Sequence, residues 1–393
     1  MNKKLFLKRG REDSIKRFHP WIFSGAVKNM DSGVNEGDVV AVYSSEGEFL
    51  CRGHYESGSI AVRILTFADE EIDAQFFKNR ISEAYCLRKK YILPSFAGEE
   101  GRVYRLVHGE GDLLSGLIVD IYGDLAVLQA HSRGMGRSWR LIAKALTDVC
   151  DNIKYVYNKS SSTLPKGNSE GDGWLSEKRE LPVSVCEYGN LFEVNPEDGQ
   201  KTGFFIDQRE NRFLLQKYSQ GASVLNLFCY TGAFSVYALR GGAAKVESVD
   251  SSLKAINLAN RNVELNFGNI GNHRGTVADI FDYLKKTEDS YDLIVLDPPA
   301  FAKHLGAVRN ALQAYRRLNA KAMEKLNPGG ILFTFSCSQA VDRQQFLQSV
   351  FSAAATAGRQ ASILHHLNQP ADHPVSIYHP EGNYLKGLAV YVK

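Results

Sequence analysis

The chain has 393 residues, of which 44% are hydrophobic and 23% charged, so it can bury a large core and form two or three domains. No stretch reaches the length of an uncharged membrane span, and the basic N-terminal segment lacks the apolar region of a signal peptide. The six cysteines are never closer than 35 residues, which disfavours a paired-cysteine metal site and a disulfide framework. We therefore expect a cytoplasmic globular protein with no membrane partner and no metal.

The positive charge of the chain is concentrated near its N-terminus, although the net charge is only +3. Residues 1–28 contain eight lysines and arginines against two acidic residues. Such a segment either contacts phosphate groups or remains a solvated basic arm, and composition leaves both interpretations open. Composition also does not decide the oligomeric state, so a homodimer is possible.

Short runs of alternating apolar residues predict a small β-barrel at the start of the chain, within residues 1–72. Residues 39–43 and 61–65 alternate with a period of two, and a turn at 44–47 separates the first run from residues 49–51. This alternation is typical of strands that are buried on one side.

A second predicted domain, residues 73–195, has a β-β-α-β-β pattern. Asp73 fits the N-cap of a helix that precedes this pattern. The pattern itself consists of strands at 116–122 and 125–130, a helix with an apolar stripe over 139–149, and strands near 153–158 and 183–194. Residues 159–173, between the last strands, are rich in Ser, Gly and Lys and predict a mobile loop.

From residue 196 to 393 strands alternate with helical stretches, which predicts an α/β domain with a doubly wound, Rossmann-like sheet. Its first strand runs into a turn that contains one glycine, Gly232, before the next helix. A pyrophosphate-binding loop needs the G-x-G-x-x-G spacing, so a dinucleotide and a nicotinamide oxidoreductase are disfavoured.

Two acidic residues close the next two predicted strands. Asp250 is placed to accept hydrogen bonds from ribose hydroxyls, and Asp279 from an adenine amine. Each aspartate fits a helix N-cap equally well. Taken together and in this order, they indicate an adenosine ligand without a diphosphate, and S-adenosylmethionine is the obvious one.

These motifs resemble those of class I methyltransferases. More closely, the chain is similar to the bacterial large-subunit (23S) ribosomal RNA cytosine-C5 methyltransferases. The resemblance runs end to end and is carried by residues 19–25, 201–209, 226–235, Asp250, Asp279, 296–299, 335–338, 371–374 and 380–387. It implies a PUA-like RNA-binding domain, a small central domain and a methyltransferase domain that acts on ribosomal RNA. The loop at 159–173 departs from the Arg/Asp-rich segment of the family, which puts RNA contacts of the central domain in doubt.

The resemblance also implies which residues bind the cofactor. Lys201 and Arg209 would pair with the methionine carboxylate, although both fit surface cations as well. Gly203 supplies a turn that brings the backbone close to a ligand. The implied cofactor-binding residues are Lys201, Thr202, Gly203, Phe205, Asp207, Arg209, Asn226, Phe228, Thr231, Gly232, Asp250, Asp279 and Asp297.

Two strand ends carry the candidate catalytic residues, Asp297 and Cys337. Each follows an apolar run typical of a buried parallel strand, and ligands collect beyond the carboxyl ends of such strands. A thiolate that adds to C6 of cytosine makes C5 nucleophilic, while Asp297 holds the base edge. A cysteine is more often an inert small hydrophobe, but the position of Cys337 after a strand and between two serines favours a nucleophile. Cys229 is the second choice.

The residues after Asp297 are candidates for substrate binding. The prolines that follow it stiffen the strand end, so Pro298 would present a carbonyl to the base, and Phe301 would stack on the base or simply pack. Lys303 is a candidate for phosphate contact, or part of a solvated helix face.

Two other functions remain open from the sequence. A guanine-N7 ribosomal RNA methyltransferase would share the sheet and the Asp-Pro-Pro motif but needs no thiol. A non-catalytic RNA-binding assembly factor would keep the fold with a vestigial cofactor pocket.

Overall fold

The computed structural model describes residues 3–96, 98, 100–165, 171–302 and 304–393. The chain divides into two compact units. The first unit comprises residues 1–188, 194–206 and 371–382, and the second comprises 189–193, 207–370 and 383–393. The division does not test the predicted boundaries at 72 and 195, which stay predictions. It does group residues 371–382, which lie in the predicted methyltransferase domain, with the first unit.

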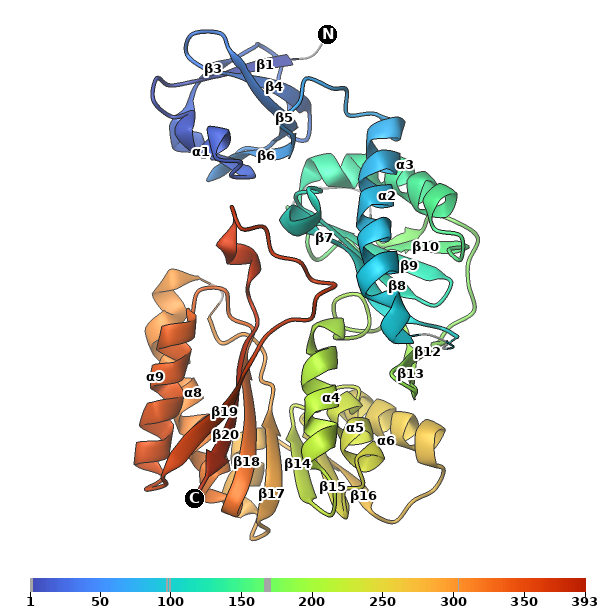
Figure 1. Cartoon of the computed structure of the whole chain (residues 1–393), viewed down its shortest axis with the longest axis vertical. Helices are drawn as coiled ribbons and strands as arrows, with labels where there is room; N and C mark the ends of the chain where they lie inside the picture. Colours follow the sequence, from blue (N-terminus) through green and yellow to red (C-terminus); the bar gives the residue numbers. More distant parts are fainter. Residues whose placement is uncertain (1–2, 97, 99, 166–170, 303) are drawn as a thin grey trace. The chain divides into compact units, whose positions relative to one another are not determined.

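The N-terminal sheet of the first unit has six strands in the order β2-β6-β5-β4-β1-β3 (Figure 1). Its elements are β1 (Lys3–Leu7), α1 (Asp13–Lys16), β2 (Trp21–Phe23), β3 (Val27–Met30), β4 (Val39–Tyr43), β5 (Phe49–Tyr55) and β6 (Ile60–Thr66). The predicted strands β4, β5 and β6 are confirmed. β1, β2 and β3 were not predicted, because β1 begins with two lysines and β2 and β3 are only three and four residues long.

The central sheet of the first unit has five strands in the order β11-β10-β9-β8-β7. Its elements are α2 (Ala74–Tyr91), β7 (Val103–His108), β8 (Leu117–Tyr122), β9 (Leu125–Ala130), α3 (Arg133–Val149), β10 (Tyr155–Asn158) and β11 (Gly173–Trp174). Asp73 caps α2 as predicted, since its side chain accepts a hydrogen bond from the Phe76 backbone N–H. β12 (Val183–Glu187) and β13 (Asn190–Val194) form a separate two-stranded sheet, and the division between the units falls within their hairpin.

The predicted β-β-α-β-β pattern differs from this sheet in two respects. β7 precedes it as a further strand, and the strand predicted near 183–194 is instead the separate hairpin of β12 and β13. β7 is buried on both faces and carries Arg105 at its centre, so its sequence shows no alternation. Arg105 is accommodated there by a two-point ion pair with Asp120 on β8, with donor–acceptor distances of 2.7 and 2.8 Å. The predicted mobile loop at 159–173 includes residues 166–170, which lie outside the described residues.

Arg88 joins three segments of the first unit. Its side chain on α2 is fully buried and forms an ion pair with Asp112, and it donates to the carbonyl oxygens of Arg105 at 2.9 Å and Asp372 at 2.8 Å. Asp372 in turn accepts from the Arg105 backbone N–H at 3.0 Å. Residues 371–382 are therefore held to the first unit by charged hydrogen bonds in a buried setting.

The second unit is built on a seven-stranded sheet in the order β16-β15-β14-β17-β18-β20-β19 (Figure 1). Its strands are β14 (Ser223–Leu227), β15 (Lys245–Asp250), β16 (His273–Val277), β17 (Tyr291–Leu296), β18 (Leu326–Ser336), β19 (Ala361–Leu367) and β20 (Lys386–Val392). The first five are parallel, and β20 inserts antiparallel between β18 and β19. The predicted doubly wound sheet is confirmed, with one reversed strand that the sequence pattern does not reveal.

Two groups of helices cover the faces of this sheet. α4 (Arg209–Tyr218), α5 (Ala233–Arg240) and α6 (Leu253–Phe267) pack side by side over β14 and β15 (Figure 1). α7 (Ile280–Lys286), α8 (Val308–Glu324) and α9 (Arg343–Thr356) form the other group, and a large buried cluster lies between them and the strands. Among the described residues, no helix combines the length and the apolarity that crossing a bilayer requires.

Replacing Arg88 by Ala should destabilise the first unit by about 3–5 kcal/mol, because the Asp112 carboxylate would stay buried without its partner. Unfolding in urea followed by tryptophan fluorescence measures this, since all three tryptophans lie in the first unit. The matched control is Lys144→Ala, which removes the exposed ion pair with Asp148 and should cost below about 1 kcal/mol. Equal losses in the two variants would contradict the role assigned to Arg88.

Candidate functional site

The strand order of the second unit reverses between β14 and β17, which both run in the same direction. The first two strands after β14 add on one side of it, and β17 and β18 add on the other. In an open α/β sheet, ligands bind beyond the carboxyl ends of the strands at such a reversal. The segments that leave β14 at residue 228 and β17 at residue 297 therefore define the candidate site.

The turn after β14 has a strained backbone, and Gly232 is required in it. Phe228 and Tyr230 both have positive φ angles, 58° and 44°, which non-glycine residues seldom adopt. Gly232 has φ 70°, and a Cβ atom on it would lie 2.6 Å from the Cβ of Ala259 on α6. The glycine thus lets α5 begin in close contact with α6. Thr231 is buried next to it, and its carbonyl accepts from Asn262 Nδ2 at 2.9 Å.

Asn226 holds the end of β14 against the start of α5. Its Nδ2 donates to Ser235 Oγ at 2.9 Å, and Ser235 Oγ lies 2.7 Å from Ser248 Oγ on β15. All three side chains are buried. The predicted cofactor residue Asn226 is thus part of a polar network that fixes the turn at residues 228–232.

The two predicted adenosine-binding acids have different surroundings. Asp250 ends β15 and accepts from the backbone N–H groups of Tyr230 at 3.1 Å and Ser252 at 2.9 Å, so it connects the turn after β14 to its own strand end. Asp279 is exposed and caps α7, since it accepts from the Asp282 N–H at 3.1 Å. The helix-cap interpretation therefore applies to Asp279 and not to Asp250, because Ser252 caps α6.

Asp297 follows β17 directly and lies in a strongly perturbed electrostatic environment. Burial raises the pKa of its carboxyl group to about 7, and the neighbouring Asp207 carboxylate acts in the same direction. A hydrogen bond from the Gln208 side chain and the Arg212 guanidinium act in the opposite direction. A carboxyl group with a raised pKa near 7 keeps a protonated form at neutral pH, which lets it donate a proton as well as accept one.

Asp207 lies between Asp297 and the C-terminal part of the chain. Its Oδ2 accepts from the Tyr384 hydroxyl at 2.6 Å. Its Oδ1 is buried and has no hydrogen-bond partner among the described residues. A buried carboxylate oxygen in this state is costly unless a ligand donates to it.

Cys337 follows β18 and lies beside the Asp-Pro-Pro segment. β17 and β18 pair in parallel with Leu296 opposite Thr334, so both strands end at the same level. The Cys337 Sγ lies 3.9 Å from the Pro298 carbonyl oxygen, and the side chain is partly exposed. Ser338 holds this arrangement, because its Oγ accepts from the Ala302 N–H at 3.2 Å and lies 3.1 Å from the Tyr315 hydroxyl. The two predicted catalytic segments are thus brought together.

The predicted substrate-binding residues occupy the same segment in part. Pro298 is buried and contributes its carbonyl oxygen to the contact with Cys337. Phe301 packs its ring against Tyr315, with a centroid distance of 4.8 Å, and remains partly exposed. Lys303 lies outside the described residues.

Four of the predicted cofactor residues, Lys201, Thr202, Gly203 and Phe205, belong to the first unit, whereas Arg209 belongs to the second. Lys201 is exposed and has a positive φ of 53°. The Thr202 hydroxyl donates to Asp120 at 2.6 Å, so it is engaged within the first unit. The Arg209 side chain is almost fully buried at the start of α4. That Lys201 and Arg209 both pair with the methionine carboxylate of the cofactor stays a prediction.

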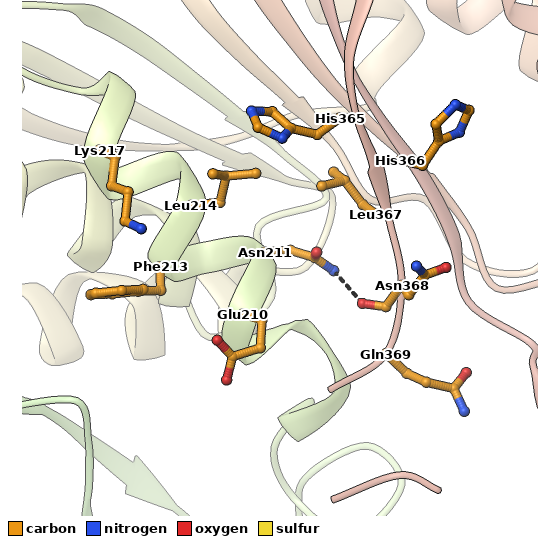
Figure 2. A pocket seen from close by; sticks show the side chains of 10 residues that line it. All are labelled: Glu210, Asn211, Phe213, Leu214, Lys217, His365, His366, Leu367, Asn368 and Gln369. Atoms are coloured by element: carbon orange, nitrogen blue, oxygen red, sulfur yellow. Dashed lines mark hydrogen bonds between the residues drawn. The ribbon is translucent and has the colours of Figure 1, made fainter. Parts of the chain in front are cut away.

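A pocket of about 330 Å³ lies beside α4 and the end of β19, and none of the predicted site residues lines it (Figure 2). Asn211 on its wall donates to the Asn368 carbonyl at 3.2 Å. Its Nδ2 also donates to Gln208 Oε1 at 2.6 Å. The pocket therefore lies behind the residue that donates to Asp297, and it is not the site at the strand ends.

Comparison with known proteins agrees with this geometry. Residues 165–381 match the S-adenosylmethionine-dependent methyltransferase family, and residues 5–67 match the PUA-like domain. Proteins called ribosomal RNA large subunit methyltransferase I are similar over nearly the whole chain. The one from Aeromonas hydrophila is 39% identical and that from Shewanella frigidimarina is 40% identical, with 99% and 98% of each chain covered.

The chain belongs to the ribosomal RNA large subunit methyltransferase I family. It is an S-adenosylmethionine-dependent methyltransferase with a PUA-like N-terminal domain. Two solved structures share its fold over the full length of both chains at 25% identity. A candidate methyltransferase from Streptococcus mutans has a TM-score of 0.85, and a candidate methyltransferase complexed with SAH has a TM-score of 0.86.

Three residues that act on Asp297 or on its neighbour Asp207 were not predicted as site residues. Gln208 and Arg212 act on the Asp297 carboxyl group directly, and Tyr384 holds Asp207. Gln208 is adjacent to the predicted Asp207 and Arg209, and Arg212 follows one helical turn later, so their helical spacing was a usable signal. Tyr384 lies 177 residues from Asp207, and no local pattern connects the two.

Replacing Asp297 by Asn should stabilise the second unit at pH 8 by roughly 1–3 kcal/mol while abolishing activity. The folded pKa of about 7 is above the ordinary value, so the ionised carboxylate opposes folding increasingly as the pH rises from about 4 to 7. The gain should therefore shrink toward pH 4. Scanning calorimetry measures it, and the tryptophan-detected transition of the first unit should not move. If Asp297→Asn stabilised the second unit equally at pH 4 and pH 8, the raised pKa of Asp297 would be contradicted.

Proposed function

We propose that this protein transfers a methyl group from S-adenosylmethionine to C5 of a cytosine in large-subunit (23S) ribosomal RNA, through a covalent bond between Cys337 and C6. The names of its relatives support ribosomal RNA of the large subunit as the substrate class. The single observation that supports the C5 chemistry is the contact between the partly exposed Cys337 Sγ and the carbonyl of Pro298, the residue that follows Asp297.

The residues at the strand ends fit S-adenosylmethionine. The unpartnered Oδ1 of Asp207 suits the ammonium group of its methionine part, and Arg209 offers a cation to the carboxylate. Asp250 ends β15 where ribose hydroxyls would donate to it, and the turn at residues 228–232 has no glycine-rich loop for a diphosphate. When bound, S-adenosylmethionine supplies an electrophilic methyl group on a positively charged sulfur.

Cys337 and Asp297 would act together on the base. The Cys337 thiolate donates its electron pair to C6 of cytosine, and the C5–C6 double bond shifts so that negative charge develops toward N3. Asp297 in its protonated form donates that proton to N3, which its pKa near 7 allows at neutral pH. C5 then becomes an enamine carbon that accepts the methyl group.

The methylated base is then released from Cys337 by elimination. A base takes the C5 proton, the electrons of that bond restore the C5–C6 double bond, and the Cys337 sulfur leaves with the C6–S pair. The proton on N3 returns to Asp297, so the enzyme regains its starting form. The segment after Asp297 contains no second cysteine to assist this step.

Access to C6 requires that the cytosine leave its stack, so an unpaired loop of RNA suits this chemistry better than a duplex. Helix α8, which follows the Asp-Pro-Pro segment, presents four exposed cations. They are Arg309, Arg316, Arg317 and Lys321. Their charge and their exposure support a role in contacting RNA phosphates near the site.

Asp207→Asn should weaken the binding of S-adenosylmethionine about tenfold, because the ammonium group of the ligand would lose a charged acceptor. Titration calorimetry of the full chain measures the Kd. The control is Asp289→Asn, which removes an exposed carboxylate that pairs with Lys245 and should leave the Kd unchanged. A complete absence of saturable heat in the unmodified protein would instead support a vestigial pocket.

Cys337→Ala should reduce methyl transfer to large-subunit ribosomal RNA by at least about a thousandfold while cofactor binding persists. RNA that contains 5-fluorocytosine should form a denaturant-resistant complex with the unmodified protein and S-adenosylmethionine, because fluorine cannot leave as a proton. Cys337→Ala should abolish this complex, and the surface variant Cys86→Ala should retain it.

Two outcomes would contradict the proposed chemistry. If Cys337→Ala still transfers methyl groups, the guanine-N7 reaction fits better, because nitrogen is nucleophilic without a thiol. If the complex forms with Cys337→Ala but is lost with Cys229→Ala, the nucleophile is Cys229. The structure favours Cys337 over Cys229 as the nucleophile, since burial raises the pKa of the Cys229 thiol far above its ordinary value.

A further inference from the structure

Lys386 is a buried lysine for which the mechanism above has no use. It opens β20, is only 4% exposed, and lies in a strand whose other residues are uncharged. Burying an ammonium group is costly unless an anion or several acceptors compensate for the lost water. We therefore expect an anionic group close to the Lys386 ammonium group.

The strand register places Lys386 next to Cys337. Lys386 lies opposite Ser336 in the antiparallel pair of β18 and β20. Its Nζ donates to the Ser338 carbonyl oxygen at 2.7 Å. The lysine is therefore bound to both residues that flank Cys337 in the sequence, one through the sheet and one through its side chain.

The charges around Lys386 single out Cys337 as its anionic partner. Burial lowers the pKa of Lys386 to about 8, and the charge of the Cys337 thiolate is the largest effect that opposes this shift. Arg343 at the start of α9 acts with burial, while Asp342 opposes it more weakly than Cys337. The Asp342 carboxylate is already engaged in capping α9, where it accepts from the Gln345 N–H at 2.7 Å.

We propose that Lys386 is a positioning residue whose ammonium group keeps the Cys337 sulfur as a thiolate. This inference rests on the proposed function of Cys337. The S–H proton leaves to solvent, and the ammonium group stays protonated beside the thiolate that forms, because the Lys386 pKa of about 8 is above neutral pH. Electrostatic coupling is reciprocal, so a thiolate that favours the ammonium is favoured by it to the same extent.

The other groups that face this pair do not replace Lys386. Tyr315 on α8 approaches Cys337, and burial raises the pKa of its hydroxyl, so it remains neutral and supplies no positive charge. Arg343 is a cation, but its Nη2 is engaged with the Asn383 side chain at 3.1 Å and the Leu385 carbonyl at 3.4 Å. Pro298 contributes only a carbonyl oxygen to Cys337. Lys386 is thus the cation held against both neighbours of the thiol.

The test is the rate of alkylation of Cys337 by iodoacetamide between about pH 5.5 and 10, in the full chain without RNA or cofactor. Peptide mass spectrometry separates Cys337 from the exposed Cys86, which serves as an internal standard. In the unmodified protein the midpoint for Cys337 should lie clearly below the ordinary thiol value of about 8.5. Lys386→Gln should raise this midpoint by about one pH unit and slow alkylation at pH 7 about tenfold.

Two further variants separate charge from structure. Lys386→Arg keeps the cation and should retain the low midpoint. Lys325→Gln removes another lysine that donates to a backbone carbonyl, that of Thr287 at 2.6 Å, at the opposite end of β18, and it should change nothing. A midpoint near 8.5 in the unmodified protein overturns the proposal even if Lys386→Gln does not fold, and so does an unshifted midpoint in folded Lys386→Gln.

The alkylation result and the 5-fluorocytosine result are independent. A low midpoint that depends on Lys386, combined with no trapped RNA, would retain the ion pair and reject the cytosine chemistry. Trapped RNA with an unshifted midpoint would retain the chemistry and reject Lys386 as the partner of Cys337.

Discussion

The parallel pairing of β17 with β18 is the constraint on which the site depends. Leu296 lies opposite Thr334, so the chain leaves both strands at the same edge of the sheet, and the Asp-Pro-Pro segment meets Cys337 there. A shift of one residue in this register would move each side chain to the other face of the sheet. Ser338 reinforces the alignment, because it bonds to both the segment after Asp297 and helix α8. The rigid sheet thus supplies the precision that reacting groups need.

The same edge concentrates ionisable groups that folding alone would not favour. Asp297 and Asp207 repel each other in a partly buried setting, Oδ1 of Asp207 lacks a partner among the described residues, and Lys386 is buried next to a thiol. Perturbed groups of this kind gather at functional sites, where the chemistry requires pKa values near neutrality. The apolar cluster between the sheet and helices α7, α8 and α9 offsets their cost, so stability and reactivity come from different parts of the second unit.

The first unit is distinct from the unit that contains Asp297 and Cys337. It contains the PUA-like sheet and residues 371–382, which are held to it through Arg88 and Asp372. Its Thr202 and Tyr122 side chains bond to each other at 2.9 Å, within the unit. Residues predicted to bind one cofactor are therefore distributed over two compact units.

The sequence by itself determined the class of fold, and it predicted Asp297 and Cys337 as the reactive pair. Alternating strands and helices, one glycine in the first turn, and the segments around Asp297 and Cys337 are local patterns, and each follows from the periodicity of buried strands or from the backbone freedom of glycine. The tertiary structure decided what depends on contacts between distant residues. The insertion of β20 beside β18, the contact of Tyr384 with Asp207, and the position of Lys386 beside Cys337 join residues about 50 to 180 positions apart. No local pattern encodes these contacts, because strand order and the burial of a charge arise only when the whole sheet has formed.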